Sequence, residues 1–231
     1  MSGITQAMTK FGRRNFFSNY CDVGYQILKT ADKKHSEEFA VPRSIKITSV
    51  KPSGTVSLLA GVTPGIHYPQ SEYYIRRIRF PTFVNQWKVL QEAGYDVEPS
   101  AYGDNTMVVS FPVREEYFDR AVTEVTMWEQ LENTAQMQYY WADNQVSVTI
   151  NFKEEEANDI QKALECYETR LKSVSFLPTS NHGYKQAPYE PITKEEYEVM
   201  KIGLKQYTFS TNTHDSDEKF CDGATCEIEV K

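Results

Sequence analysis

Hydrophobic residues recur every three or four positions near the start of the chain, which predicts helical structure across residues 2–39. The apolar positions form two stripes, first Ile4, Ala7, Met8 and Phe11, then Tyr20, Val23, Ile27, Leu28 and Ala31. Gly12 and Gly24 weaken the continuity of this pattern, because glycine is a poor helix former. We therefore expect two helices here, or one helix with a break.

The rest of the chain alternates short β-rich runs with longer amphipathic segments. Strands are predicted at residues 45–50, 106–113, 146–152 and 174–178, where β-branched and other apolar residues predominate. Helices are predicted at residues 82–94, 123–141, 154–171 and 193–206, the last with a Thr193/Glu196 capping box.

Residues 73–80 (YYIRRIRF) carry three arginines among aromatic and aliphatic residues. This segment is compatible with a strand or a short helix. Arg76, Arg77 and Arg79 then form either a solvated face or a basic edge near a phosphate or a partner.

The stretch from residue 49 to residue 69, SVKPSGTVSLLAGVTPGIHYP, has the composition of an anion-binding turn. Pro52 ends the preceding strand because proline cannot donate to a β-ladder. Gly54 lets the backbone come close to a ligand, and the first N–H groups of a following helix point outward without an internal partner. Further donors are the hydroxyls of Ser53, Thr55 and Ser57.

We interpret this stretch as a cradle for a phosphate or diphosphate. An ordinary N-capped helix explains the same residues, since serine and threonine are favoured caps. The stretch is not a Walker loop, because no Gly-Lys-Ser/Thr follows the first glycine.

The C-terminal stretch combines a polar segment with two cysteines. Residues 210–218 are polar, with Asn212, Asp215, Ser216 and Asp217 among them, and are predicted to be flexible. Cys221 and Cys226 follow in CDGATCEIEVK, five positions apart and separated by a glycine-containing spacer. Such a dithiol suits thiol–disulfide exchange. Zinc binding is the alternative, but zinc usually takes four ligands and only His214 lies nearby.

Composition limits the classes of function. The 231 residues suffice for one large or two small domains, and 40% hydrophobic residues can form a packed core. The net charge is −7 and no dense Lys/Arg block is present, which argues against nucleic-acid binding. Neither a signal-peptide pattern nor a membrane-length apolar run occurs. Four cysteines without a secretory signal indicate the reducing cytoplasm.

Several segments share a resemblance to one enzyme family. VKPSGTVSLLAGVTPGIH resembles the phosphate-binding segment of ribonucleotide reductases, especially the adenosylcobalamin-dependent class II enzymes of the monomeric type. SGITQAMTKFGRR, WADNQVSVTINF and HGYKQAPYEPITKEEYEVM are similar to other parts of the same family. The likeness covers nearly all of this chain but only about the C-terminal third of a family enzyme.

The resemblance implies a fold and a division of the chain. Residues 1–208 would be the C-terminal part of a ten-stranded α/β barrel, and residues 209–231 a flexible redox-active tail. Four predicted strands cannot close such a barrel, so another chain is expected to complete it and cover the open strand edges. The gene is then either split, or this chain is a fragment.

The resemblance also implies site residues. The substrate phosphates would be bound by Pro52, Ser53, Gly54, Thr55, Val56 and Ser57. Cys221 and Cys226 would re-reduce the active site after each turnover. No metal ligands are predicted.

The implied reaction converts ribonucleotides, triphosphates in preference to diphosphates, to 2′-deoxyribonucleotides by thiyl-radical chemistry. An N-terminal reductase chain would supply the radical cysteine, and adenosylcobalamin would be bound mainly by or with that partner. Thioredoxin or a similar dithiol would be the reductant. Two other functions stay open, a stand-alone nucleotide-phosphate-binding module and a thiol–disulfide oxidoreductase acting on other proteins.

Overall fold

The computed structural model describes residues 1–52, 54, 56–179 and 185–208. Ser53 and Thr55 of the predicted phosphate cradle therefore lie outside the described residues. The predicted flexible tail with Cys221 and Cys226 lies outside them as well.

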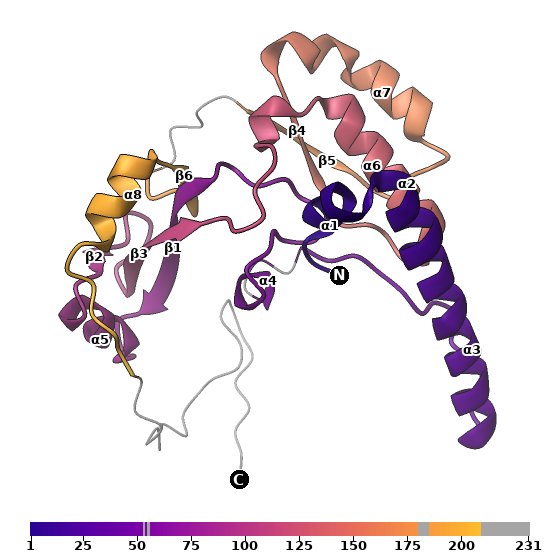
Figure 1. Cartoon of the computed structure of the whole chain (residues 1–231), viewed down its shortest axis with the longest axis horizontal. Helices are drawn as coiled ribbons and strands as arrows, with labels where there is room; N and C mark the ends of the chain where they lie inside the picture. The colour runs from indigo at the N-terminus through magenta and orange to yellow at the C-terminus, as the bar shows by residue number, and fades with distance from the viewer. Residues whose placement is uncertain (53, 55, 180–184, 209–231) are drawn as a thin grey trace.

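The N-terminal region is helical, as predicted, and has one break. Helix α1 (Ile4–Phe11) ends at Gly12, whose φ of 79° no other residue type adopts easily. A short α2 (Arg13–Asn15), a π-helical segment (Phe16–Asp22) and α3 (Val23–Glu38) then continue without interruption through Gly24. Figure 1 shows α3 extending away from the other elements.

Two strands are parallel and carry helices in their connections. Strand β4 (Thr149–Phe152) pairs with β5 (Ser175–Pro178), and the crossover between them contains a 3-10 segment (Glu154–Asp159) and α7 (Ile160–Tyr167). Helix α6 (Met127–Tyr140) precedes β4 and packs on it. These elements confirm the strands predicted at 146–152 and 174–178 and the two helices beside them, with shorter bounds.

The strand predicted at residues 45–50 is reduced to a single parallel bridge between Val50 and Val146. Its backbone instead bonds to the turn that follows α6. The Ile47 N–H donates to Asp143 Oδ2 at 2.8 Å, and the Thr48 carbonyl accepts from the Asn144 N–H at 3.0 Å. Those groups are then not available for a continuous β-ladder.

A second, four-stranded sheet is antiparallel throughout and has the order β2-β3-β1-β6. Its strands are β1 (Tyr73–Pro81), β2 (Asp96–Pro99), β3 (Thr106–Arg114) and β6 (Tyr189–Pro191). It lies with α5 (Gln86–Glu92) and α8 (Lys194–Lys201) on the left of Figure 1, apart from the parallel pair. The strand predicted at 106–113 is thus confirmed, but it was counted with the other three as a barrel strand, whereas it pairs only within this antiparallel sheet.

Two buried clusters form the core around the parallel strands. One joins α1 and the π-helical segment to Val50 and Val146, and the other joins α6 and α7 to Ile150. Val148 packs against both clusters, so the 146–152 segment lies between them.

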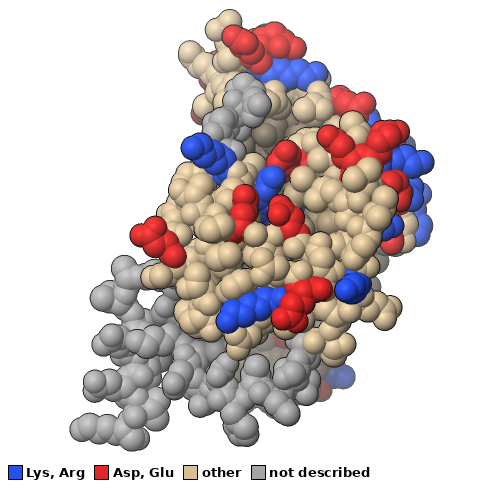
Figure 2. Space-filling view, turned by 90° about the vertical axis from the view of Figure 1, so that its left-hand side faces the viewer, with Lys and Arg blue, Asp and Glu red and all other residues tan. Residues whose placement is uncertain are grey.

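The surface of the antiparallel region carries mixed charge. Figure 2 shows Lys/Arg and Asp/Glu side chains interspersed on this face, without a broad patch of either sign among the residues it colours. Within the described part of the chain, no helix has the length and apolar character needed to cross a membrane.

Candidate functional site

The predicted phosphate segment folds as a tight turn followed by one turn of helix, α4 (Val56–Leu59). The Gly54 N–H donates to the Pro52 carbonyl at 2.8 Å, and the Ser57 carbonyl accepts from Ala60 and Val62. Pro52 and Val56 are exposed, Gly54 is half-buried, and Ser57 is buried. Ser57 therefore contributes to packing, while Pro52, Gly54 and Val56 face accessible space.

The second half of the segment packs closely against the backbone of the first half. Gly65 has a φ of +54°, and a Cβ at that position would lie 2.9 Å from the Lys51 carbonyl oxygen. The N-terminal N–H groups of Gly3 and Ile4 donate to the carbonyls of Thr63 and Gly65 at 2.9 and 3.2 Å. Residues 63–65 thus connect the start of α1 to the backbone just before the predicted cradle.

His67 is bonded through both ring nitrogens. Its Nδ1 lies 3.0 Å from the Pro64 carbonyl, and its Nε2 lies 3.1 Å from the backbone nitrogen of Thr149. Because the Thr149 N–H must donate, Nε2 is the acceptor and the proton sits on Nδ1. Burial lowers the pKa of His67, which also favours the neutral ring.

A cavity of ≈ 290 Å³ opens beside this segment. Pro52 and Gly54 line it on one side, together with residues of the 63–70 stretch. The antiparallel sheet supplies the other side through Tyr74, Arg76, Glu115 and Tyr189. The cavity therefore lies where the predicted cradle meets the second sheet.

Glu115 is a buried carboxylate in the wall of this cavity, only 5% exposed. It accepts hydrogen bonds from the Tyr74 hydroxyl at 3.3 Å and from Gln6 Nε2 at 2.9 Å. Gln6 Oε1 in turn accepts from the Thr63 hydroxyl at 2.7 Å. Burial raises the pKa of the Glu115 carboxyl. This network connects α1, the 63–65 turn and strand β1.

Tyr68 is held by a second polar network on α6. Its hydroxyl donates to Glu129 at 3.0 Å and accepts from Asn133 Nδ2 at 3.0 Å. Arg120 binds both Glu129 oxygens, at 2.6 and 3.0 Å, and lowers the pKa of that carboxyl. The C-terminal end of the 49–69 stretch is therefore fixed to α6 as well as to β4.

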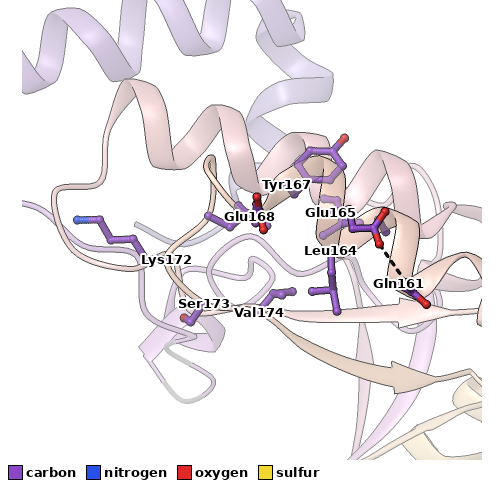
Figure 3. A pocket seen from close by; sticks show the side chains of 11 residues that line it. Gln161, Leu164, Glu165, Tyr167, Glu168, Lys172, Ser173 and Val174 are labelled. Carbon is purple, nitrogen blue, oxygen red and sulfur yellow. Dashed lines mark hydrogen bonds between the residues drawn. The ribbon is translucent and has the colours of Figure 1, made fainter.

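A further groove of ≈ 280 Å³ lies beside α7, where Leu164 and Val174 line it with Gln161 and Lys172 at its margin (Figure 3). The Gln161 side chain donates to Glu165 at 3.0 Å along the helix surface. Apolar side chains predominate in the lining, and the groove shares no lining residue with the cavity at Gly54. We interpret this groove as a result of side-chain packing and not as part of the candidate site.

The sequence predicts that Cys21 is a half-buried helix residue and that Cys166 packs near the apolar stripe of its helix. Cys21 is instead fully buried, and burial raises the pKa of its thiol to about 12. Cys166 is exposed on α7, so the packed position predicted for it is wrong. Neither residue has a second cysteine as partner among the described residues. That part of the chain also contains no group of three His, Cys, Asp or Glu side chains able to hold a metal ion.

The Asp-Asn pair at residues 143 and 144, after the predicted 123–141 helix, is typical of a cap and turn, and Asp143 lies in the turn that follows α6. It accepts the Tyr25 hydroxyl at 2.5 Å and the Ile47 N–H at 2.8 Å. Sequence reasoning did not single out His67, Tyr74, Glu115 or Tyr189. The weak signal available was that His67 falls within the 49–69 stretch and that Tyr74 and Arg76 lie two residues apart in a possible strand.

Comparison with known proteins yields no matching family model. The chain is 44% identical over 236 aligned residues to a probable adenosylcobalamin-dependent ribonucleoside-triphosphate reductase of Dictyostelium discoideum, covering 99% of this chain and 31% of that protein. It is also 44% identical to the adenosylcobalamin-dependent ribonucleoside-triphosphate reductase of Euglena gracilis, covering 98% of this chain and 32% of that protein. The chain is homologous to part of the adenosylcobalamin-dependent ribonucleotide reductases.

A solved structure agrees with this relationship. A crystal structure of a B-12-dependent (class II) ribonucleotide reductase matches with a TM-score of 0.76 at 33% identity, over 88% of this chain and 32% of that chain. The predicted resemblance to ribonucleotide reductases is therefore confirmed. The chain spans about a third of the length of the relatives it matches.

Proposed function

We propose that this chain acts as one part of an adenosylcobalamin-dependent ribonucleotide reductase and binds the phosphates of the ribonucleotide. The observation that carries this proposal is 44% identity over 99% of the chain to a probable ribonucleoside-triphosphate reductase. The reaction would replace the ribose 2′-hydroxyl by hydrogen, with ribonucleoside triphosphates as the preferred substrates.

Phosphate binding is assigned to residues 52–57. The turn at Gly54 exposes backbone near the cavity, and nothing outside the neighbouring residues lies within 4 Å of a Cβ built there. A phosphate oxygen can then approach the N–H groups that begin α4, whereas the Gly54 N–H already donates to the Pro52 carbonyl. Charge-assisted hydrogen bonds of this kind contribute about 1.5–3 kcal/mol each. The proposed set is Pro52, Ser53, Gly54, Thr55, Val56 and Ser57.

The remainder of the reductase must supply the radical chemistry. The described residues contain one parallel strand pair and a bridge, so the strands have edges that further strands can cover. Helix α3 also presents Val23 and Ile27, which are 48% and 63% exposed. We propose that an N-terminal reductase part with the radical cysteine packs against these surfaces.

Adenosylcobalamin is assigned mainly to that other part. A corrinoid is larger than a drug-sized ligand, and the cavity of ≈ 290 Å³ is at the lower limit even for drug-sized ligands. The cavity beside the cradle therefore does not fit the cofactor.

The dithiol role of Cys221 and Cys226 follows from electron balance. Removing the 2′-hydroxyl as water consumes two electrons, which two active-site thiols supply as they become a disulfide. A thiolate of the tail attacks that disulfide to form a mixed disulfide, and the second tail cysteine displaces it. The tail leaves as a disulfide, and thioredoxin or a similar dithiol reduces it.

The experiment that tests the proposal is reconstitution. The chain is combined with the remaining part of the reductase, and deoxyribonucleotide formation from a ribonucleoside triphosphate is measured with adenosylcobalamin and thioredoxin. Substitution Gly54→Val fills the approach to the cradle and should weaken nucleotide binding at least tenfold, while thermal unfolding changes little. Unchanged affinity in Gly54→Val would reject the phosphate site. An isolated chain that reduces protein disulfides without a ribonucleotide would favour the thiol oxidoreductase instead.

A further inference from the structure

Three arginines lie on β1, and they differ in their partners. Arg77 pairs with Glu190 at 2.5 Å, and Arg79 is exposed with its Nη2 3.1 Å from the Gln186 carbonyl. Arg76 has no carboxylate partner among the described residues, and its Nη1 donates only to the Pro188 carbonyl at 3.2 Å. Arg76 and Arg79 therefore both lack a carboxylate partner among the described residues, and of the two only Arg76 lines the cavity.

The strand register directs Arg76 into the cavity. Successive side chains of a strand point to opposite faces, so Arg76 shares a face with Tyr74 and not with Arg77. Arg76 lies directly opposite Tyr189 of β6, and its guanidinium is 4.3 Å from the centre of that ring. Stacking on an aromatic face leaves the N–H groups at the guanidinium edge free to bind a planar or tetrahedral anion.

One of these N–H groups is left without a partner. Arg76 Nε is buried and makes no hydrogen bond to any described residue. A buried donor without an acceptor is unfavourable. Arg77 Nε is unpaired as well, but Arg77 is paired with Glu190 and does not line the cavity, so the open donor beside the cavity is that of Arg76. The cavity beside it is lined by Pro52 and Gly54, so an anion held at the cradle can also meet Arg76.

The nearby Glu115 carboxylate is not the acceptor for Arg76 Nε. Glu115 lines the same cavity, but its two oxygens accept from Tyr74 and Gln6. Tyr74 is two residues before Arg76 on the same face of β1, so the Glu115 bond fixes the strand where Arg76 enters the cavity. Arg76 thus has a defined position and an available charge.

We propose that Arg76, stacked on Tyr189, binds the phosphate groups of the nucleotide that extend beyond the Gly54 turn. The described residues of the cradle offer backbone N–H groups but no cation, whereas a nucleoside triphosphate carries several negative charges. A polyphosphate chain can contact both walls of the cavity, and a single phosphate at Gly54 leaves Arg76 unused. Arg76 therefore distinguishes nucleotides by the length of their phosphate chain. The nature of the ligand rests on the proposed function, while the anion site rests on the cavity and the arginine.

The test compares Arg76→Gln with Arg79→Gln in the chain assembled with the rest of the reductase. Affinities are measured for a ribonucleoside triphosphate, the corresponding monophosphate and inorganic tripolyphosphate. Arg76→Gln should weaken triphosphate and tripolyphosphate binding at least tenfold and monophosphate binding less than twofold. Arg79→Gln removes the same charge from the exposed face of the same strand and should change all three less than twofold. Arg76→Lys keeps the charge without the stack and should give an intermediate loss.

The outcomes separate this inference from the proposed function. An assembled enzyme that reduces ribonucleotides with unchanged triphosphate affinity in Arg76→Gln overturns the role of Arg76 and leaves the reductase function standing. Equal weakening of triphosphate and monophosphate also overturns it, because discrimination by chain length is then absent. Tripolyphosphate binding that depends on Arg76 in an assembly without reductase activity supports the anion site and rejects the reductase function. Thermal unfolding of each variant verifies that a loss of affinity does not come from unfolding.

Discussion

His67 and Thr149 connect the predicted phosphate stretch to the parallel strands, because His67 Nε2 accepts the Thr149 backbone N–H at 3.1 Å. Thr149 is the first residue of β4, and His67 lies 13 residues after Gly54 in the chain. The same ring is fixed on its other side by the Pro64 carbonyl. The imidazole thus joins the turn that precedes it, at Pro64, to the start of strand β4.

Replacing His67 with alanine should destabilise the fold. The substitution leaves the Thr149 N–H without its acceptor, which costs about 1–3 kcal/mol for a buried group. The Pro64 carbonyl still accepts the backbone N–H of residue 67. The free energy of unfolding from urea denaturation measures this loss. His35→Ala is the control, because His35 lies on the exposed end of α3 with 60% of its side chain accessible, and it should change stability by less than about 0.5 kcal/mol.

His67 should also make the free energy of unfolding depend on pH. Burial lowers the folded pKa of His67 below the usual histidine value of 6.5, so at acidic pH the unfolded chain binds the proton more readily than the folded chain. The stability associated with neutral His67 is fully present above pH 6.5 and is lost as the pH falls through the lowered folded pKa. Between about pH 7 and about pH 5, His67→Ala should therefore lose less unfolding free energy than the wild type. Equal slopes in the two proteins would contradict this assignment.

Two glycines of the stretch should respond differently to alanine. Gly65 has a positive φ and its Cβ would lie 2.9 Å from the Lys51 carbonyl oxygen, so Gly65→Ala should cost roughly 1–3 kcal/mol of stability. Gly54 has open space around its Cβ direction, so Gly54→Ala should leave stability within about 0.5 kcal/mol of wild type. Thermal unfolding of the two variants tests the contrast, and a similar loss in both would show that Gly65 has no special role.

Much of the local structure is predictable from the sequence. Periodicity gives the helix break at Gly12, and β-branched content gives β3 and the strands at 149–152 and 175–178. These signals are local, because they depend on residues a few positions apart.

The pairing of the strands and the cavity are not local properties. Strand β6 is three residues long in a proline-rich stretch, so its pattern does not distinguish it from a loop. Tyr189 meets Arg76 across 113 positions of chain, and Gln6 meets Glu115 across 109. The segment at 45–50 has the composition of a strand, but the turn at Asp143 and Asn144 takes up its backbone hydrogen bonds.

The exposed face of α3 tests the proposed assembly. Ile27 is 63% exposed and lines a shallow hollow with Val23 and Ala31. Ile27→Glu would place a charge in an apolar interface, where desolvation is costly, and should lower co-purification with the remaining reductase part at least tenfold. Val199→Glu on α8 is the matched control, since Val199 is 66% exposed on the side of the antiparallel sheet, and it should change co-purification less than twofold. Full recovery of the Ile27→Glu complex would exclude α3 from the interface.

The C-terminal cysteines should be required for repeated turnover, and Cys166 provides the control variant. A buried active site is poorly accessible to a protein reductant, so a dithiol within the enzyme must carry electrons to it. Cys221→Ser and Cys226→Ser should each allow about one turnover and stop further turnover with thioredoxin, whereas dithiothreitol, a small molecule, should restore much of the activity. Cys166 is exposed but has no partner cysteine among the described residues, so Cys166→Ser should keep full thioredoxin-driven turnover. Cys21 is a poorer control because it is fully buried, and its replacement would perturb packing. If both tail variants kept full thioredoxin-driven turnover, the dithiol assignment would be wrong, and a structural or zinc-binding pair would explain the two cysteines better.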